Sequence, residues 1–526
     1  MAAAVIWLST WLWIGGDQAF ARLWPSIVAL SLVFLLRSVL AGLLGGAFCG
    51  AILLANGNPL VAFIAFFRAH LIPSLQSSWN ASILVFTLLM GGFVALIEHG
   101  GGISGLLRRF VRGRGAVKGR IQWAAFGLGV VCFFDGLANS MLVGRVMRPL
   151  ADRVGLSRAK LAYVVDSTSA PIACVALIST WIAYQLAMIQ EGLSQVGVEG
   201  NPYLLFVRSI PVNFYCLFTL LLVGLTILTG FNLGPMRRAE AQAETTRGEE
   251  PFSEDDPREG HWARAVIPLV TLILALLVGM AVSGSDALLP IRFSRIMEAF
   301  GAADAALVLV CASAFACIVA GLMNYRPGRK PRAGDAFLEG MTTLFVPMLI
   351  LVSAWCLSST LKQLGAAEAL TRLLSGTLRP SLIPAAVFLI GTLVSFCTGT
   401  SWGTMGVLMP LAVPLAVSLS TGLAPDVADT ILVGTIAAVF SGAVFGDHCS
   451  PMSDTTIVSS IASGIDPIDH VQTQLPYALV AAAVAMAAGF LPYGLGLPFW
   501  GSWLVGGGVL VVLVLEPWRK TRPAPS

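Results

Sequence analysis

Long apolar runs recur along almost the entire chain. Twelve of them have about the length that a helix needs to cross a lipid bilayer, roughly 15–25 residues, and they lie near 2–14, 24–37, 39–55, 81–98, 160–186, 204–230, 264–282, 303–324, 338–361, 428–460, 475–492 and 500–515. Only 11% of the residues are charged and 56% are hydrophobic, whereas a soluble domain has about 25% charged residues. Because so few charges cannot cover a surface that faces water, we expect an all-α polytopic membrane protein with about 12 transmembrane helices.

Two further regions, near 121–150 and 381–420, are apolar but interrupted by polar residues and glycines. Basic residues flank the first region on both sides, over 108–120 and 148–160. Since Lys and Arg concentrate in cytoplasmic loops, both ends of this region are expected in the cytoplasm, which makes it a re-entrant hairpin. Counting the spans forward gives a second hairpin that enters and leaves on the outside. It also predicts a multi-pass protein of the cell (inner) membrane with cytoplasmic N- and C-termini.

The order of spans repeats with the opposite orientation. Three spans, a hairpin and two spans in the first half are followed by the same order from the other face, and such inverted repeats point to a transporter with its site at the membrane midplane. The predicted organisation has five parts: an N-terminal span or interfacial helix at 1–23, a first repeat at 24–230, a flexible cytoplasmic linker at 231–263, a second repeat at 264–492, and a last span with a cytoplasmic tail at 493–526. Each repeat contains a hairpin followed by a broken helix. These lie at about 121–150 and 160–186 in the first repeat and at about 381–420 and 428–460 in the second.

The tips of the two hairpins carry oxygen-bearing side chains. The first tip reads FFDGLANS and the second CTGTSWGT, and the candidate ligands are Asp135, Asn139, Ser140, Thr400 and Ser401. Hard cations such as Na⁺ prefer these oxygens. Clusters of Gly, Ser and Thr also serve tight helix packing in membranes, so either tip alone is compatible with packing.

Each broken helix combines a proline with carboxylates and hydroxyls. Pro171 and Pro451 remove a backbone donor and free carbonyl groups, which protein, water or an ion must satisfy within lipid. The side chains around them that we expect to bind an ion or substrate are Asp166, Ser167, Thr168, Asp447, Ser450, Ser453, Asp454 and Thr455. Helix capping explains one carboxylate near each break, but it does not explain both Asp447 and Asp454, seven residues apart and near one face of a helix. His448 is either a proton carrier or a structural hydrogen-bond partner.

Other classes of function lack support in the sequence. No Walker A, HExxH or zinc-ligand spacing is present, so we expect no enzyme activity and no cofactor beyond Na⁺ as a transported or coupling ion. No basic tract is interleaved with aromatic residues, so nucleic acid is not an expected partner. Nine cysteines, none in a CxxC pair, are expected to be buried core residues.

Three segments resemble the NhaC family of Na⁺/H⁺ antiporters, within the wider ion-transporter superfamily. They are VGRVMRPLADRVGLSRAKLAYVVDSTSAPIACVALISTWIAY, CTGTSWGTMGVLMPLA and FGDHCSPMSDTTIVSS, and the resemblance extends over about residues 24–490. It implies a sodium–proton exchanger. Some members resemble exchangers of organic substrates, such as malate for lactate. The superfamily implies paired hairpins, an elevator-like transport domain and a dimerising scaffold, hence a homodimer.

The first tip departs from the pattern of that family. The family usually has Asp-Asp-Tyr-x-Asn, whereas this chain has Asp135, Gly136, Leu137, Ala138 and Asn139. Our leading hypothesis is Na⁺/H⁺ antiport, with Na⁺ and H⁺ competing for Asp166, Asp447 and Asp454, and with Asp135 next. The alternative is a Na⁺- or H⁺-coupled carrier of a small organic anion or amino acid, because Gly136 removes a negative charge and makes room.

Overall fold

The protein is helical throughout the part of the chain that can be described. The computed structural model describes residues 8–14, 19–36, 38–102, 118–245, 261–285, 299, 302–325, 332–374 and 378–521, and every regular element in these ranges is a helix. Nine of these helices are long and apolar enough to cross a membrane, or ten if the bent pair over 202–229 is one span. Three shorter apolar helices, Phe20–Val33, Val39–Leu54 and Phe499–Leu515, accompany them. The expectation of an all-α multi-pass membrane protein is therefore confirmed.

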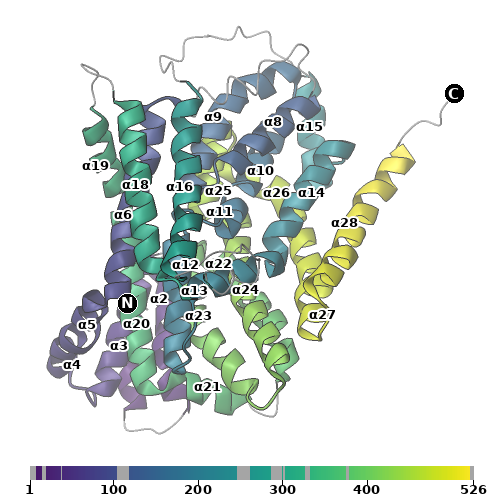
Figure 1. The fold of residues 1–526 in the computed structure, drawn as a ribbon. Helices are drawn as coiled ribbons and strands as arrows, with labels where there is room; N and C mark the ends of the chain where they lie inside the picture. Colours follow the sequence, from purple (N-terminus) through teal and green to yellow (C-terminus); the bar gives the residue numbers. More distant parts are fainter. Residues whose placement is uncertain are drawn as a thin grey trace.

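The helices of the first half occupy two sides of the molecule. They are η1 (Ser9–Trp13), α2 (Ala19–Leu36), α3 (Val39–Leu54), α4 (Pro59–Ala65), η2 (Phe66–Leu71), α5 (Ile72–Gln76), α6 (Ser78–His99), α8 (Lys118–Val131), α9 (Gly136–Val154), α10 (Arg158–Ser167), α11 (Ala170–Val175), α12 (Ile182–Gln195), α13 (Pro202–Ser209), η3 (Ile210–Val212), α14 (Phe214–Thr229) and α15 (Gly234–Thr245). Figure 1 shows α6 on one side of the molecule and α14 on the other.

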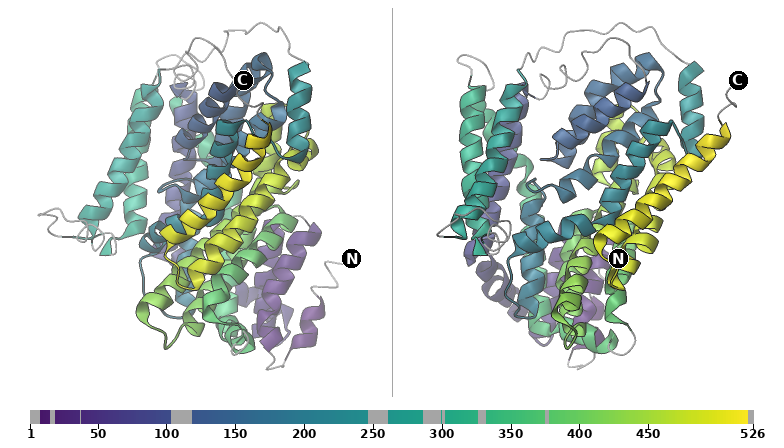
Figure 2. Two further views of the ribbon diagram at one scale, coloured as in Figure 1. Left: turned by 90° about the vertical axis from the view of Figure 1, so that its right-hand side faces the viewer. Right: turned by 45° about the vertical axis from the view of Figure 1, so that its right-hand side comes forward.

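The second half begins beside α6 and ends beside α14. Its elements are α16 (Ala263–Ser283), α18 (Ala305–Asn324), α19 (Ala333–Thr343), α20 (Phe345–Leu364), α21 (Ala366–Leu374), η4 (Pro380–Leu382), α22 (Ile383–Thr398), α23 (Ser401–Leu419), α24 (Pro425–Cys449), α25 (Asp454–Ser463), α26 (Pro467–Val484), η5 (Ala485–Phe490), α27 (Leu491–Gly494) and α28 (Phe499–Thr521). Helices α18 and α19 pack against α6, and α28 packs against α14. Figure 2 shows α28 lying obliquely along the outside of the molecule.

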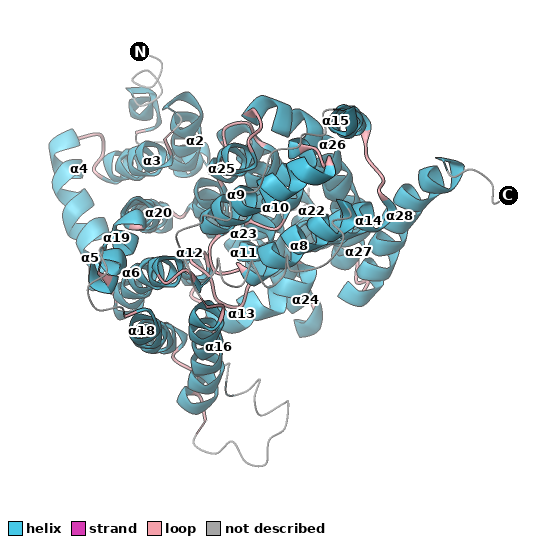
Figure 3. Cartoon of the chain, turned by 90° about the horizontal axis from the view of Figure 1, so that it is seen from above, coloured by secondary structure: helices cyan, strands magenta, loops and turns pink. Residues whose placement is uncertain are grey.

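The central helices come from both halves. Seen from above, α9, α10, α25 and α26 lie inside a surround formed by α2, α4, α16, α18 and α28 (Figure 3). Helix α25 contacts both α9 and α10, and α26 contacts α10. Segments that are about 300 residues apart in the chain are thereby brought side by side, which positions the site described below.

Several boundaries differ from the sequence-based expectations. The apolar segment 59–76, which was not expected to span, forms a helix long enough to do so. The run near 160–186 contains parts of three helices, α10 to α12, and the run near 204–230 bends by 43° between η3 and α14.

The prediction of a flexible linker is wrong for residues 234–245, which form α15 and pack on α10 and α26. The rest of that linker, at 246–260, and the basic stretch 103–117 lie outside the described residues, as do 1–7 and 15–18 at the N-terminus.

Helices α22 and α24 approach each other through glycine. A Cβ atom added to Gly442 would lie 3.0 Å from the backbone of Gly391 and from the carbonyl oxygen of Phe388. The Oγ of Ser395 donates to the carbonyl oxygen of Gly442 at 2.6 Å, and the amide of Gly446 donates to that Oγ at 3.0 Å. Because α24 carries Asp447 one turn further on, this close contact fixes the position of that carboxylate.

Replacement of Gly442 by leucine should destabilise the protein. A larger side chain in a filled interface costs about 1–3 kcal/mol or more, so we expect a lower melting temperature of the purified protein in detergent. Gly508→Leu is the matched control, because a Cβ atom there meets nothing within 4 Å. Equal melting temperatures for the two variants would contradict this account of the α22–α24 contact.

Candidate functional site

The first hairpin tip is hydrogen-bonded to the first helix break. Helix α10 ends at Ser167 and α11 begins at Ala170, with Pro171 in its first turn. The side-chain nitrogen Nδ2 of Asn139 donates to the carbonyl oxygen of Thr168 at 2.6 Å and to that of Gly129 at 2.9 Å. These bonds satisfy backbone groups around a break where the regular helical pattern is interrupted.

Hydroxyl groups extend this connection. The Oγ of Ser140 donates to the Oγ of Ser169 at 2.9 Å, which in turn donates to the carbonyl oxygen of Gly136 at 2.5 Å. Asp135 is the N-cap of α9, because its Oδ1 accepts from the amide of Ala138 at 2.7 Å, and its Oδ2 accepts from Thr180 Oγ1 at 2.8 Å. Both oxygens of Asp135 therefore have protein donors.

The second tip is bonded to the second break in a comparable way. Helix α24 ends at Cys449 and α25 begins at Asp454, and Pro451 lies between them. Thr400 is the N-cap of α23, accepting from the amide of Gly403 at 3.2 Å. The next residue, Ser401, donates from Oγ to Asp447 Oδ2 at 2.7 Å and from its amide to Oδ1 at 3.3 Å. Ser453 Oγ donates to the same Oδ1 at 3.3 Å, so the carboxylate of Asp447 has three donors.

Thr456 joins the two halves of the chain. Its Oγ1 lies 2.7 Å from the carbonyl oxygen of Asp447 and 3.4 Å from Oδ2 of Asp166. Thr455 Oγ1 donates to the same Asp447 carbonyl at 2.9 Å and lies 3.1 Å from Ser453 Oγ. The first turn of α25 thus contacts the carboxylate of Asp166 and the backbone carbonyl of Asp447.

Asp166 is fully buried, and its two oxygens have different surroundings. Its Oδ2 accepts from Gln474 Nε2 at 2.7 Å and lies 3.3 Å from His470 Nε2. Its Oδ1 has no hydrogen-bond partner among the described residues, and the same holds for the buried Oε1 of Gln474 and Oδ1 of Asn139. Buried acceptors without a donor are rare in proteins and require an explanation such as a bound ion.

His448 extends the network away from Asp166. Its Nε2 lies 2.8 Å from Ser167 Oγ and its Nδ1 2.7 Å from Tyr215 Oη, and its carbonyl oxygen accepts from Gln474 Nε2. Both ring nitrogens are therefore engaged within the protein, and the histidine connects α24 to α10 and α14.

The structure brings together most, but not all, of the expected ligands. Asn139, Ser140 and Thr168 meet at the first break, and Ser401, Asp447, Ser453 and Thr455 meet at the second. Asp454 is exposed, and the expectation that it shares one helix face with Asp447 is wrong because the helix breaks between them. Ser450 Oγ accepts from the amide of Met452 at 3.3 Å. No three His, Cys, Asp or Glu side chains of the described residues are placed to hold a metal ion together.

Four residues of the network were missing from the sequence-based site: Tyr215, Thr456, His470 and Gln474. His470 and Gln474 are four residues apart on α26, so they lie on the same face of that helix. The polar segment DHVQTQ immediately before the apolar run at 475–492 was the available signal. Thr456 directly follows the expected ligand Thr455 in the polar stretch SDTTIVSS. Tyr215 carries no comparable signal, because an isolated hydroxyl in an apolar run is common in packed helices.

The arrangement favours the binding of a proton or a small hard cation. It offers carboxylate, hydroxyl and carbonyl oxygens, the ligands that hard cations prefer, and one carboxylate oxygen, Asp166 Oδ1, to which no described residue donates. A charged group buried away from water is costly unless it is compensated. A proton or a monovalent cation would supply that compensation at Asp166.

Comparison with known proteins places these observations in a wider context. The sequence model of the Na⁺/H⁺ antiporter family matches residues 172–495. An uncharacterised protein of Haemophilus influenzae is 30% identical over 487 residues, which cover 89% of this chain and 90% of that protein. The malate-2H⁺/Na⁺-lactate antiporter of Bacillus subtilis is 33% identical over 164 residues, which cover 30% of this chain and 33% of that protein.

A solved structure has a similar fold. The YdaH transporter of Alcanivorax borkumensis superimposes with a TM-score of 0.56 over 92% of this chain and 99% of that chain. The sequence identity is 16%, so the likeness concerns the fold alone.

Replacement of Asn139 by alanine should destabilise the protein through the first helix break. The carbonyls of Thr168 and Gly129 would lose their donor, and each unsatisfied buried group costs about 1–3 kcal/mol. Ser140→Ala is the matched control with a smaller expected effect, because Ser169 still donates to Gly136. The measurement is thermal unfolding in detergent, and an Asn139→Ala variant as stable as Ser140→Ala would refute the role assigned to this amide.

Proposed function

Because the chain belongs to the Na⁺/H⁺ antiporter family, we propose that it is a secondary active transporter that exchanges Na⁺ for H⁺ across the cell (inner) membrane. The single observation that carries this proposal is the fully buried carboxylate of Asp166, which has donors on Oδ2 and none among the described residues on Oδ1. We propose that the exchanged cation or proton binds at Oδ1 of Asp166.

Exchange follows from competition for the same oxygens. Na⁺ at Asp166 would be shared with nearby hydroxyl and carbonyl oxygens, and Thr456 links Asp166 to the backbone carbonyl of Asp447. Neutralisation by either Na⁺ or H⁺ stabilises the buried carboxylate, so the empty, charged form would change conformation least readily. No cofactor takes part in this scheme, and Na⁺ is the substrate.

The topology expected from the sequence fits this function. We propose that α8–α9 and α22–α23 are the two re-entrant hairpins, although α22 and α23 belong to segments that are each long enough to span. We propose that the halves 24–230 and 264–492 are inverted repeats, and that both termini lie in the cytoplasm. Elevator-like movement and a homodimer are the corresponding proposals for mechanism and assembly. The bonding of each tip to its own helix break supports the repeat.

A coupled exchange of a small organic anion is the second candidate. A relative that aligns with about a third of its length is named a malate-2H⁺/Na⁺-lactate antiporter. Gly136 removes the second carboxylate of the family pattern from the first tip, although the position is closely packed, since an added Cβ would lie 3.3 Å from Ser169 Oγ. In this scheme Na⁺ or H⁺ at Asp166 is the coupling ion and the organic anion binds at the hydroxyl-rich tips.

Asp166→Asn and Asp447→Asn should each abolish the Na⁺-induced pH change in everted membrane vesicles. An amide cannot exchange a proton for Na⁺, and at Asp447 it would also replace a carboxylate that accepts from Ser401 and Ser453. Asp426→Asn is the control, because this exposed carboxylate lies in the first turn of the same helix α24. Full exchange in both buried variants would remove this site from consideration.

Asp454→Asn should have a graded effect on the same assay. Asp454 is exposed beside the second tip, where it can attract Na⁺ but is partly screened by water. We expect a raised apparent KM for Na⁺ that becomes less pronounced as ionic strength increases. Complete loss of exchange at saturating Na⁺ would instead make Asp454 a direct ligand.

Proteoliposomes containing the purified protein and a pH dye separate the two candidate cargoes. Na⁺/H⁺ exchange predicts a pH change with Na⁺ alone, in the absence of any organic acid. Coupled anion exchange predicts that the change requires an organic acid such as malate or lactate. The Asp166→Asn protein serves as the inactive control in both arms.

A further inference from the structure

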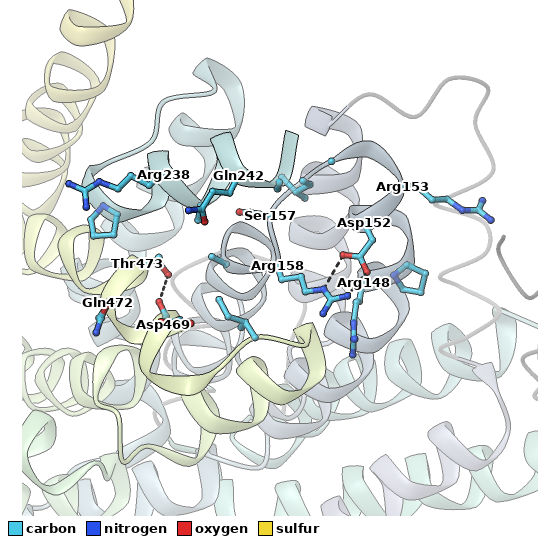
Figure 4. A pocket seen from close by; sticks show the side chains of 18 residues that line it. Arg148, Asp152, Arg153, Ser157, Arg158, Arg238, Gln242, Asp469, Gln472 and Thr473 are labelled. Atoms are coloured by element: carbon cyan, nitrogen blue, oxygen red, sulfur yellow. Dashed lines mark hydrogen bonds and ion pairs between the residues drawn. The ribbon is translucent and has the colours of Figure 1, made fainter. Parts of the chain in front are cut away.

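A polar cavity of about 820 Å³ opens on the face where α9 meets α10, and its wall reveals a contact between the two halves of the chain. The cavity is lined by α9, α10, α15 and α26, and its charged residues are Arg148, Asp152, Arg153, Arg158, Arg238 and Asp469. The excess of arginine first suggests an anion site. In Figure 4, however, Arg153 and Arg238 extend away from each other at opposite ends, whereas Arg148 and Arg158 lie close together at one wall.

Arg148 and Arg158 both contact Gly464, the residue that ends α25. Arg158 Nη1 donates to the carbonyl oxygen of Gly464 at 3.2 Å. The guanidinium of Arg148 packs so closely that a Cβ atom on Gly464 would lie 2.4 Å from Arg148 Cζ. Gly464 has φ +75°, which glycine adopts without strain, and its lack of a side chain leaves room for the guanidinium.

Asp152 orients Arg158 for this contact. Arg158 donates from Nε to Asp152 Oδ1 and from Nη2 to Oδ2, both at 3.1 Å. Such a two-pronged pair fixes the plane of the guanidinium. The carbonyls at the end of a helix also carry partial negative charge, so two arginines there are electrostatically favourable. The α9–α10 junction of the first half thus holds the C-terminus of a helix from the second half.

The other end of α25 lies in the proposed transport site. Its first turn presents Thr455 and Thr456 to the Asp447 carbonyl and to Asp166. The helix has ten residues, which corresponds to about 15 Å. Because α24 and α25 are separated by a break, no continuous helix fixes the axial position of α25, and α24 holds only its first turn, through the bonds of Thr455 and Thr456 to the Asp447 carbonyl. That position depends on what α25 packs against and on what holds its far end.

We propose that Arg148 and Arg158 form a clamp on Gly464 that sets the axial position of α25 and thereby the spacing of the oxygens around Asp166 and Asp447. They are positioning residues, since they act through α25 and do not touch the cargo. The packing of α9 on α25 supports this role, because a Cβ atom on Gly144 would lie 2.6 Å from Ala462 Cβ. The consequence for transport rests on the function proposed above, whereas the clamp itself is a property of the fold.

The double variant Arg148→Gln/Arg158→Gln tests the clamp in two ways. In proteoliposomes we expect the apparent KM for Na⁺ to rise roughly two- to fivefold, the range for partly exposed charged contacts, with a smaller change in maximal rate. In hydrogen–deuterium exchange of the detergent-purified protein, we expect faster exchange in the peptide 454–464. Arg158→Lys alone should change the apparent KM and the exchange of peptide 454–464 less than the double variant does, because lysine retains the charge of Arg158 but not its paired bonds to Asp152.

Arg238→Gln is the matched control. Arg238 lines the same cavity from α15, away from Arg148 and Arg158 (Figure 4), so this variant should behave as the wild type. Equal KM shifts in the control and the double variant would overturn the clamp and assign the effect to the charge of the cavity. Unchanged KM and unchanged exchange in peptide 454–464 would overturn it as well. If the wild type moved no Na⁺, the proposed function would fail, and hydrogen–deuterium exchange would still decide on the clamp.

Discussion

Two helices end in the interior of this protein, and the backbone groups exposed at those ends must find partners without bulk water. Within a membrane this requirement is stricter than in any soluble fold. The protein meets it with side chains from the first tip and from the helix after the second break: Asn139 donates to the carbonyl of Thr168, and Thr455 and Thr456 of α25 donate to that of Asp447. The breaks, the tips and the buried carboxylates are therefore parts of one arrangement.

Helix α25 links the parts of that arrangement. It begins at the second break, contacts the carboxylate of Asp166 and the backbone carbonyl of Asp447, packs along α9 and ends beside two arginines of the first half. A short helix that is separated from its neighbour by a break can shift with little distortion of its own hydrogen bonds. A shift of α25 at Gly464 would therefore also move its first turn, where Thr455 and Thr456 contact Asp447 and Asp166.

Much of this architecture could be predicted from the sequence, for identifiable physical reasons. Apolar runs and the scarcity of charge indicate membrane helices, and Pro171 and Pro451 next to buried acids draw attention to the regions where the helices break. The segment 59–76 was missed because Arg68 and His70 lower its hydropathy, although the structure folds it as one long helical segment. Helix α15 was missed because its polar composition resembles that of a linker, while its packing on α10 and α26 is a tertiary property.

The composition of the site was harder to predict than its location. Asp447 and Asp454 look equivalent in sequence, yet the break makes one of them buried and the other exposed. His470 and Gln474 lie about 300 residues from Asp166 and become its neighbours only through the packing of α26 on α10. No local pattern encodes such a contact, so a single sequence identifies the carboxylate but not its donors.

The two buried carboxylates differ in a way that assigns them different tasks. Asp447 receives donors on both oxygens, from Ser401 and Ser453, and its backbone carbonyl receives two more. Asp166 has all its contacts on Oδ2 and none from the described residues on Oδ1. A carboxylate whose oxygens are all occupied by donors is compensated within the protein, whereas one with a bare oxygen requires a ligand. This asymmetry supports our proposal that the exchanged ion binds at Asp166, while Asp447 holds the second tip against the break through Ser401.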